Sequence, residues 1–143
     1  MIIGIGSDHG GFELKEYLKK FLFDLNIEIK DFGCFSTDSV DYPDIAIPLC
    51  KELQRGSLDR GILICGTGLG MSITANRFRG IRATLCNDIF SAKMSRRHND
   101  SNLLCLGGRI LGKDLAKEIL ITWLNEKFEG DRHIRRLKKI DEN

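Results

Sequence analysis

The stretch from Gly61 to Arg77, GILICGTGLGMSITANR, constrains the fold more than any other part of the chain. It begins with consecutive apolar residues from Ile62 to Cys65, a pattern typical of a parallel strand covered on both faces. Glycines follow at three alternate positions, and a helix is expected from about Leu69 to Asn76. Because glycine permits positive φ and close approach to the backbone, the loop amides and the helix N-terminus could hold a negative charge.

This loop matches neither of the common nucleotide-binding motifs. GTGLG lacks the G-x-G-x-x-G spacing of dinucleotide-binding proteins, and no Lys-Ser or Lys-Thr pair follows it as in a P-loop. The stretch by itself therefore leaves two interpretations open, a site for a small anion and a purely structural turn.

Composition excludes several classes of protein. The 143 residues, 42% hydrophobic and 29% charged, fit one globular domain spanning 1–143, and a net charge of +2 gives no argument for nucleic acid or a membrane. No apolar run reaches membrane-spanning length, and the start lacks the basic region of a signal peptide. Five scattered cysteines without a CxxC pair favour free thiols in a reducing cytoplasm and argue against a zinc site.

Hydrophobic periodicity predicts five strands that alternate with helices. The expected strands are 2–6, 27–32, 61–65, 81–86 and 103–106. The expected helices are 11–25, one that begins near Asp41 or Tyr42, 69–76, 88–97, 113–128 and a basic helix at about 131–140. Pro48 should either kink the second helix or mark its true beginning. This alternation predicts a parallel sheet with helices on both faces, in a three-layer α/β domain.

Ligands of such open sheets bind beyond the C-terminal ends of the strands, where the strand order reverses. The loops that follow the first and third expected strands contain Ser7-Asp8-His9 and Cys65-Gly66-Thr67. We therefore expect the chemistry of this protein in the crevice between those two loops.

Six short motifs occur along the chain in a characteristic order. They are Asp8-His9-Gly10-Gly11-Phe12, Asp41-Tyr42-Pro43, Gly61 to Arg77, Gly80-Ile81-Arg82-Ala83, Arg97-His98-Asn99-Asp100 and Gly130-Asp131-Arg132-His133. With these motifs the chain resembles the ribose-5-phosphate isomerase B family, which includes allose- and galactose-6-phosphate isomerases. The resemblance covers nearly the whole chain. It implies a Rossmann-like α/β/α sandwich with a five-stranded parallel sheet, and a homodimer or tetramer with active sites shared between subunits.

The implied activity is an aldose–ketose isomerase of the pentose phosphate pathway that interconverts ribose 5-phosphate and ribulose 5-phosphate through an enediolate. Such a reaction requires a base beside the carbon and donors for the developing oxyanion. By resemblance, Cys65 is the base. Some members use a glutamate at the position of Met71, which cannot take a proton, so this chain resembles the cysteine branch. The alternative for Cys65 is an inert thiol at the end of a strand.

The resemblance also implies roles for other polar residues. It assigns a proton shuttle to Thr67, sugar contacts and help in proton movement to Asp8, and ring opening to His98. It assigns further substrate contacts to a set of loop residues: His9, Tyr42, Gly66, Gly68, Gly70 and Asn99. The glycine amides would form the oxyanion site. Without the resemblance, Asp8 would be interpreted as a turn cap and His98 as a solvated loop histidine.

Phosphate binding is assigned by the resemblance to His9, Arg109, Arg132 and Arg136. A helix places Arg132 and Arg136 on one face, and paired guanidiniums suit a phosphate. A solvated basic helix is the alternative, and no motif supports a nucleic-acid patch. The family also suggests that His98, Asn99 and Arg109 reach the Cys65 site of a partner subunit.

Two other functions remain open at this stage: an allose-6-phosphate or galactose-6-phosphate isomerase, and a non-catalytic sugar-phosphate sensor. The resemblance implies that galactose-6-phosphate isomerase divides its catalytic residues between two different chains, so the presence of Cys65, His98 and Asn99 in one chain favours a self-sufficient isomerase. A sensor would need the arginines but not Cys65. No metal or cofactor is expected. We also expect the loop amides to stabilise the Cys65 thiolate more than burial opposes it, so that Cys65 reacts before Cys34 or Cys50.

Overall fold

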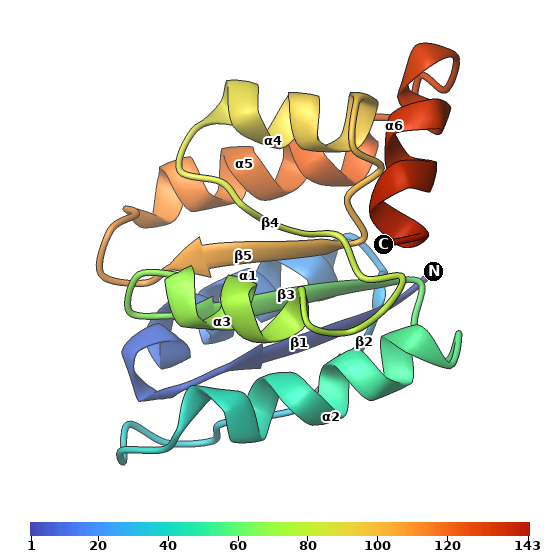
Figure 1. Ribbon diagram of the computed structural model, residues 1–143. Helices are drawn as coiled ribbons and strands as arrows, with labels where there is room; N and C mark the ends of the chain where they lie inside the picture. Colours follow the sequence, from blue (N-terminus) through green and yellow to red (C-terminus); the bar gives the residue numbers. More distant parts are fainter.

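Five parallel strands form one sheet in the order β2-β1-β3-β5-β4, in a computed structural model that describes all 143 residues (Figure 1). The strands are β1 (Ile2–Ser7), β2 (Glu28–Asp31), β3 (Arg60–Cys65), β4 (Ala83–Leu85) and β5 (Leu103–Gly107). Every neighbouring pair is parallel, which confirms the predicted fold class.

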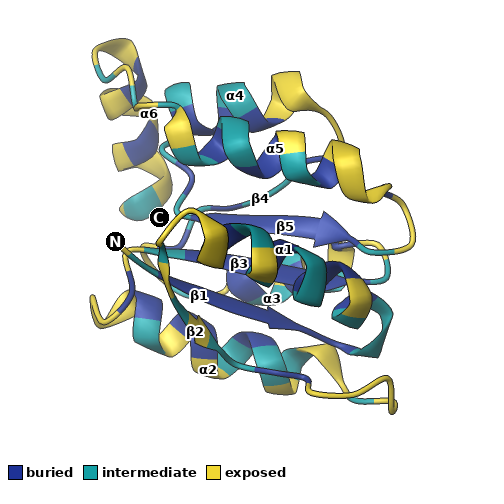
Figure 2. Ribbon diagram, turned by 180° about the vertical axis from the view of Figure 1, so that it is seen from behind, coloured by how far each residue is buried: buried dark blue, intermediate teal, exposed yellow.

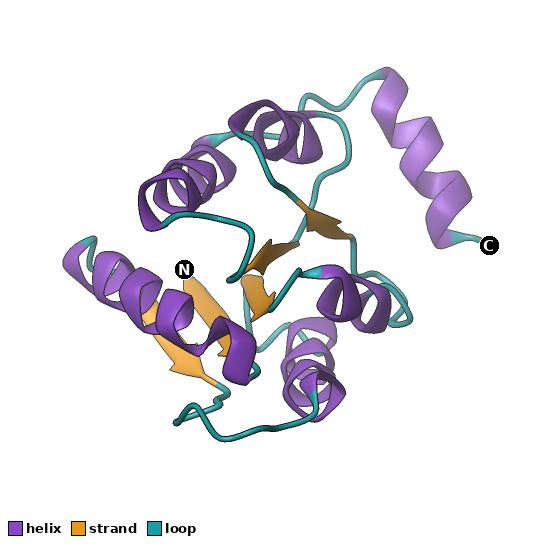
Figure 3. Cartoon of the chain, turned by 90° about the vertical axis from the view of Figure 1, so that its left-hand side faces the viewer, coloured by secondary structure: helices purple, strands orange, loops and turns teal.

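Helices cover both faces of this sheet. They are a short 3-10 helix η1 (His9–Gly11), α1 (Phe12–Asp24), α2 (Tyr42–Gln54), α3 (Leu69–Ala75), α4 (Ile89–Arg97), α5 (Lys113–Asn125) and α6 (Arg132–Asp141). Buried residues of α1 and α5 pack on one face and those of α2 and α3 on the other, whereas α6 stands apart from the sheet (Figure 3). None of the helices has the length and apolar character needed to cross a bilayer.

Strand β3 lies in the middle of the sheet and is buried on both sides. Ile62 and Ile64 contribute to the core formed with α1 and α5, whereas Leu63 and Cys65 contribute to the core formed with α2 and α3. Figure 2 shows the central strands as the most buried part of the molecule. Burial of each large aliphatic side chain stabilises the fold by about 1.5–3 kcal/mol. The unbroken apolar run in the sequence is therefore explained by two cores that share one strand.

Two element boundaries differ from the sequence expectations by more than one residue. The expected strand 81–86 is reduced to the short edge strand β4, because Ile81 N–H is used in a turn to Phe78 O. The expected helix 113–128 ends at Asn125, where the next residue becomes extended. The other boundaries agree within one residue.

The position of Pro48 is also settled by the structure. Helix α2 begins at Tyr42, with Asp41 as its N-cap residue and Pro43 in the first turn. Pro48 therefore lies inside the helix and does not begin it. A proline in the first turn removes no helical hydrogen bond, because the first N–H groups of a helix have no intrahelical partner.

A buried ion pair joins α1 to the end of β2. The side chain of Lys15 has no exposed surface, and its Nζ lies 2.9 Å from both carboxylate oxygens of Asp31. Lys19 Nζ lies 2.6 Å from Asp31 Oδ2, and the Gly33 N–H donates to Oδ1. Burial opposes ionisation of Asp31, but hydrogen bonds from Lys19, Lys15 and Gly33 outweigh it and lower the pKa of this carboxyl.

Asp31→Asn should lower the free energy of unfolding by about 3 kcal/mol at neutral pH, since it leaves the buried Lys15 ammonium without its carboxylate. Because the folded-state pKa is lowered, the contribution of Asp31 is complete above pH about 4 and is lost as the pH falls through the folded value. Urea unfolding at several pH values should therefore show the difference from wild type shrinking in acid.

The control is Glu52→Gln, which breaks the exposed pair between Lys30 and Glu52. An exposed pair contributes about 0–1 kcal/mol, so the control should be nearly silent. Equal losses in both variants would show that burial of Lys15 is not what makes the Asp31 pair important.

Candidate active site

Three loops meet at the C-terminal ends of β1, β3 and β5. Asp8 N–H donates to Ile64 O at 3.1 Å, so the first loop is joined to the end of β3. Gly108 N–H donates to Cys65 O at 2.8 Å, which joins the third loop to the second. The strand order reverses between β1 and β3, so these loops lie at the crevice where a parallel sheet binds its ligands.

Cys65 is the last residue of β3 and is only 5% exposed. Its Sγ accepts a hydrogen bond from the Gly68 N–H at 3.1 Å. Gly68 has φ +80, and a Cβ at this position would lie 2.5 Å from Leu85 Cδ1 and 3.0 Å from Leu106 O. Only glycine therefore fits the turn that directs this N–H at the sulfur. A backbone donor of this kind stabilises a thiolate.

The fully buried thiols elsewhere in the fold have a different environment. Burial raises the pKa of Cys50 to about 12, and burial also raises the pKa of Cys86 and of Cys105. None of these three accepts a hydrogen bond from a loop amide of the kind that Gly68 gives Cys65. Cys65 is thus distinguished from them by a backbone amide donor to its sulfur.

Asp8 caps a turn, which was the alternative interpretation of this residue. Its Oδ1 accepts the N–H groups of Gly10 at 2.9 Å and Gly11 at 3.2 Å. Both bonds use Oδ1, so Oδ2 can still accept a bond from a sugar hydroxyl. The cap and the proposed substrate contact are therefore compatible.

His9 is oriented by a backbone group that the sequence did not identify. Its Nδ1 accepts the Val40 N–H at 3.3 Å. A neutral imidazole that accepts at Nδ1 carries its proton on Nε2, and this N–H can donate to a phosphate oxygen. Since any residue but proline offers a backbone N–H, no side-chain pattern could have pointed to position 40.

Arg109, Tyr42 and Thr67 complete the first cluster. A Cβ at Gly66 would lie 3.3 Å from Arg109 Nη1, and a Cβ at Gly70 would lie 2.6 Å from Tyr42 Cζ, so both side chains lie directly over the glycine loop. Thr67 is exposed beside Cys65. We call the following residues the Cys65 group: Asp8, His9, Tyr42, Cys65, Gly66, Thr67, Gly68, Gly70 and Arg109.

The position of Arg109 corrects one expectation. The family resemblance predicts that Arg109 is among the residues that reach the Cys65 site of a partner subunit. Its backbone N–H instead donates to Gly66 O of its own chain at 2.9 Å, and its side chain lies against the same loop. Arg109 is therefore a neighbour of Cys65 within one chain.

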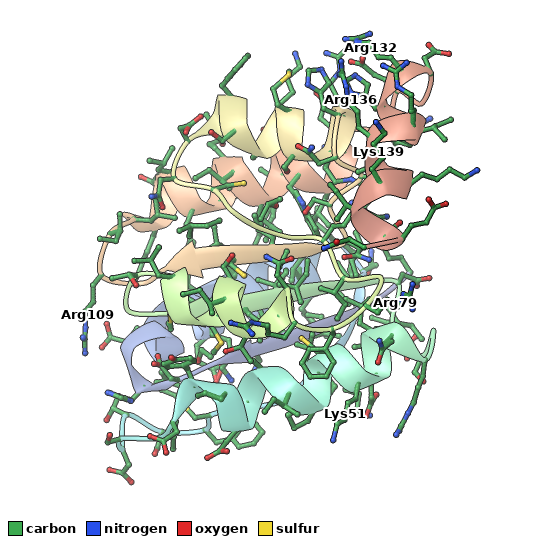
Figure 4. The ribbon with its side chains drawn as sticks, in the orientation of Figure 1. Lys51, Arg79, Arg109, Arg132, Arg136 and Lys139 are labelled. Atoms are coloured by element: carbon green, nitrogen blue, oxygen red, sulfur yellow. The ribbon has the colours of Figure 1, made fainter.

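The remaining predicted residues lie at the opposite end of the sheet. Figure 4 shows Arg109 at one end of the strands and Arg132 and Arg136 at the other, on α6. His98 caps the C-terminus of α4, and its ring stacks on His133 of α6 at a centroid distance of 4.2 Å. One chain thus does not bring His98, Asn99, Arg132 and Arg136 to its own Cys65.

Two residues beside His98 were not identified from the sequence. Glu129 Oε2 lies 4.0 Å from His98 Nε2 and 3.9 Å from His133 Nε2. His133 is 3% exposed and its Nε2 has no hydrogen-bond partner. Burial and then the nearby Arg132, His98 and Arg136 lower the pKa of His133. The four-residue spacing of Glu129 and His133 was a signal for their contact, but nothing in the sequence linked either to His98. We call His98, Asn99, Glu129, Arg132, His133 and Arg136 the His98 group.

Three side chains place possible metal-ligand atoms within 4.8 Å of one another: His98, Glu129 and His133. The sequence argument against a zinc site considered the cysteines and did not identify this cluster. Imidazole and carboxylate are ligand types that zinc accepts. The two rings, however, are only 16° from parallel, so their in-plane lone pairs do not converge on one point. In this arrangement the three side chains do not form a metal site.

Gly68→Ala should slow alkylation of Cys65 by iodoacetamide, because the added methyl group displaces the turn that supplies the amide donor. Left-handed backbone costs a residue with Cβ about 1–2 kcal/mol, and the contacts with Leu85 and Leu106 add to this cost. The rate of Cys65 modification is measured by mass spectrometry of labelled peptides.

Gly80→Ala is the matched control, since Gly80 has φ +82 but open space around its Cβ position. It should lower stability without changing the Cys65 rate. The same rate of Cys65 labelling in wild type, Gly68→Ala and Gly80→Ala would disprove the role given to the Gly68 amide.

Comparison with known proteins identifies the family. A profile described as Ribose/Galactose Isomerase matches residues 3–140. Ribose-5-phosphate isomerase B of Escherichia coli (strain K12) is 45% identical over 138 residues, which are 96% of this chain and 93% of that protein. The solved structure of Clostridium thermocellum ribose-5-phosphate isomerase B has a TM-score of 0.98 at 51% identity, covering 99% of this chain and 96% of that one.

A further solved structure carries a ligand. The Mycoplasma genitalium ribose-5-phosphate isomerase B with bound ribulose-5-phosphate has a TM-score of 0.95 at 36% identity, and the match covers 99% of this chain and 94% of that one. Both the sequence and the fold are thus shared with these enzymes over nearly their whole length. The chain belongs to the ribose/galactose isomerase family.

Proposed function

We propose that residues 1–143 form one isomerase domain that interconverts ribose 5-phosphate and ribulose 5-phosphate through an enediolate. The observation that carries this proposal is the Gly68 N–H donated to Cys65 Sγ at 3.1 Å, in the crevice at the end of β3. The relatives named as ribose-5-phosphate isomerase B support the substrate.

In the proposed reaction, the Cys65 thiolate removes the proton from C2 of the open-chain aldose, and the resulting thiol returns a proton to C1. Amides of the glycine loop stabilise the charge on the oxygen as it develops, and Thr67 moves a proton between O1 and O2. Asp8 Oδ2 accepts a bond from a sugar hydroxyl. Met71 is fully buried and carries no basic atom, so it does not compete with Cys65 for the role of base. This scheme uses no metal ion and no organic cofactor.

A complete site would require two subunits. His9 Nε2–H and Arg109 would bind the phosphate from the Cys65 group, while Arg132 and Arg136 would come from the His98 group of a second copy. That second copy would also bring His98 to open the sugar ring and Asn99 to bind the sugar. Since the two groups lie at opposite ends of one chain, a homo-oligomer is part of the proposal.

Exposed apolar side chains support this assembly. Four large apolar residues on elements that flank the Cys65 group are each more than half exposed. They are Leu69, Ile73, Phe90 and Ile110. Apolar surface gathered around a functional site is typical of an interface. A second copy that covers this surface would also exclude water from the reaction.

Cys65→Ser should lower turnover by roughly 10²–10⁴-fold, the contribution of a positioned general base. Substrate binding should persist, because the phosphate contacts are unchanged. Exchange of solvent deuterium into C1 of ribulose 5-phosphate, followed by NMR, should nearly stop.

Cys34→Ser is the control for this experiment, since Cys34 is also buried but hydrogen-bonds to Ser36 O and lies outside the Cys65 group. It should exchange as wild type does. Near-normal exchange in Cys65→Ser would move the base to another residue, with Asp8 as the next candidate.

Subunits that carry Cys65→Ala should regain activity when mixed with subunits that carry His98→Ala. Random pairing of equal amounts of two inactive dimers restores about one quarter of the sites, because one of the two sites in each hybrid receives both intact groups. Activity is measured after subunit exchange has been verified by native mass spectrometry.

Arg109 provides a sharp control, because it lies on the same side of the proposed interface as Cys65. Mixing Cys65→Ala with Arg109→Ala should restore no activity, because no hybrid site holds both residues intact. Mixing Cys65→Ala with Arg132→Ala should restore activity, because one site of each hybrid does. No recovery in the His98 and Arg132 mixtures would refute the shared site.

A further inference from the structure

We propose that Glu129 and His133 are positioning residues that hold the His98 ring for opening of the sugar ring. This inference rests on the proposed function, in which His98 acts on the cyclic form of the substrate. Glu129 and His133 would act only through His98.

Glu129 is held by Arg97, the residue that precedes His98 in the chain. Its backbone N–H donates to Arg97 O at 3.0 Å, and its Oε1 lies 2.6 Å from Arg97 Nε. These two contacts leave Oε2 as the oxygen that faces the imidazoles. At 4.0 Å from His98 Nε2 and 3.9 Å from His133 Nε2, Oε2 is about 1 Å beyond hydrogen-bond length from each.

His133 supports the other side of His98. Its ring is buried and nearly parallel to that of His98, with an angle of 16° between the planes. Burial first, and then the charges of Arg132, His98 and Arg136, lower the pKa of His133, so that it should remain neutral at neutral pH. A neutral ring stacked on His98 limits rotation of that ring without competing for its charge. The unpartnered Nε2 of His133 lies within a small movement of Glu129.

The chemistry explains why such support is needed. Opening the furanose breaks the C1–O4 bond, leaves a carbonyl at C1, and moves one proton from O1 to O4, with no net change in protons. If His98 carries that proton, its ring must keep its orientation while it gains and loses a charge. A carboxylate at the ring edge offers an acceptor to an imidazole N–H that points toward it, and a stacked ring resists reorientation.

Charged and titratable groups lie around the stacked rings of His98 and His133. They are Arg97 of α4, Glu126 and Glu129 of the loop that follows α5, and Arg132, His133 and Arg136 of α6. Glu129 is the acidic group among them that approaches both imidazoles. Glu129 is therefore the acidic group whose removal should free the His98 ring to change its orientation.

The test compares two reactions of the same enzyme. Ribose 5-phosphate is mostly cyclic and must be opened, whereas ribulose 5-phosphate cannot close a furanose ring because its O5 carries the phosphate. Glu129→Gln and His133→Phe should each lower turnover of ribose 5-phosphate about tenfold or more, as for a displaced general acid–base. Deuterium exchange at C1 of ribulose 5-phosphate should stay near the wild-type rate.

Further variants separate positioning from general damage. Glu129→Asp should recover part of the lost turnover, since it keeps the charge. In Glu129→Gln, the loss should fall on kcat and leave the KM for ribose 5-phosphate near the wild-type value, because the residues proposed to bind the phosphate are unchanged. Glu126→Gln is the matched control: Glu126 Oε2 lies 3.9 Å from Arg97 Nε, but Glu126 has no contact with either histidine. It should behave as wild type in both reactions.

Three outcomes would overturn the inference. Equal loss of both reactions in Glu129→Gln would indicate damage to the assembled site, and wild-type behaviour in both would show that His98 needs no support. Inhibition of the wild type by added Zn²⁺ alone, absent in His133→Phe, would identify the cluster as a metal site instead. Failure of the proposed function is distinguishable, because the wild type itself would then neither isomerise ribose 5-phosphate nor exchange ribulose 5-phosphate.

Discussion

The hydrogen bond from Gly68 N–H to Cys65 Sγ depends on a turn that the two cores hold in place. Strand β3 is paired with β1 on one side and β5 on the other, so its last residue cannot shift along the sheet. Leu85 and Leu106 then leave room only for glycine at position 68. The packing that stabilises the fold therefore also directs the Gly68 N–H at the Cys65 sulfur. A substitution at Gly68 should affect both stability and the reactivity of that sulfur.

The sheet was predictable because its strands obey a simple rule. A strand buried on both faces must be apolar at every position, and Ile62 to Cys65 met that rule in the sequence. Strand β4 was overestimated because an apolar stretch at the sheet edge can also serve a turn, as Ile81 does. The predicted end of α5 lay too far along the chain, because the helical pattern of the sequence continues past Asn125. In the structure Glu126 is extended, and its carbonyl oxygen accepts a hydrogen bond from Arg96 of α4. Local pattern thus located the elements, and tertiary contacts decided where two of them stop.

The site was predictable only in part, for reasons that differ between residues. Strand order brings the Asp8 and Cys65 loops together, so that juxtaposition followed from topology. The contact between His9 and Val40 did not follow from topology, because a backbone N–H has no signature in the sequence. His98 and His133 are far apart in the chain, and their stacking depends on where α6 docks. That docking involves Arg82 and Asp141, 3.4 Å apart, which no periodicity could reveal.

The division of the site between two ends of the sheet gives the phosphate a particular importance under the proposed function. His9 and Arg109 approach it from the Cys65 group, and Arg132 and Arg136 approach it from the His98 group of another subunit. The phosphate does not react, so its binding energy is available to orient the groups that do. A dianion bound by cations from both subunits would fix the distance between Cys65 of one and His98 of the other. Since the two residues would belong to different subunits, this distance cannot be set by the core of a single chain, and the substrate itself would help to define it.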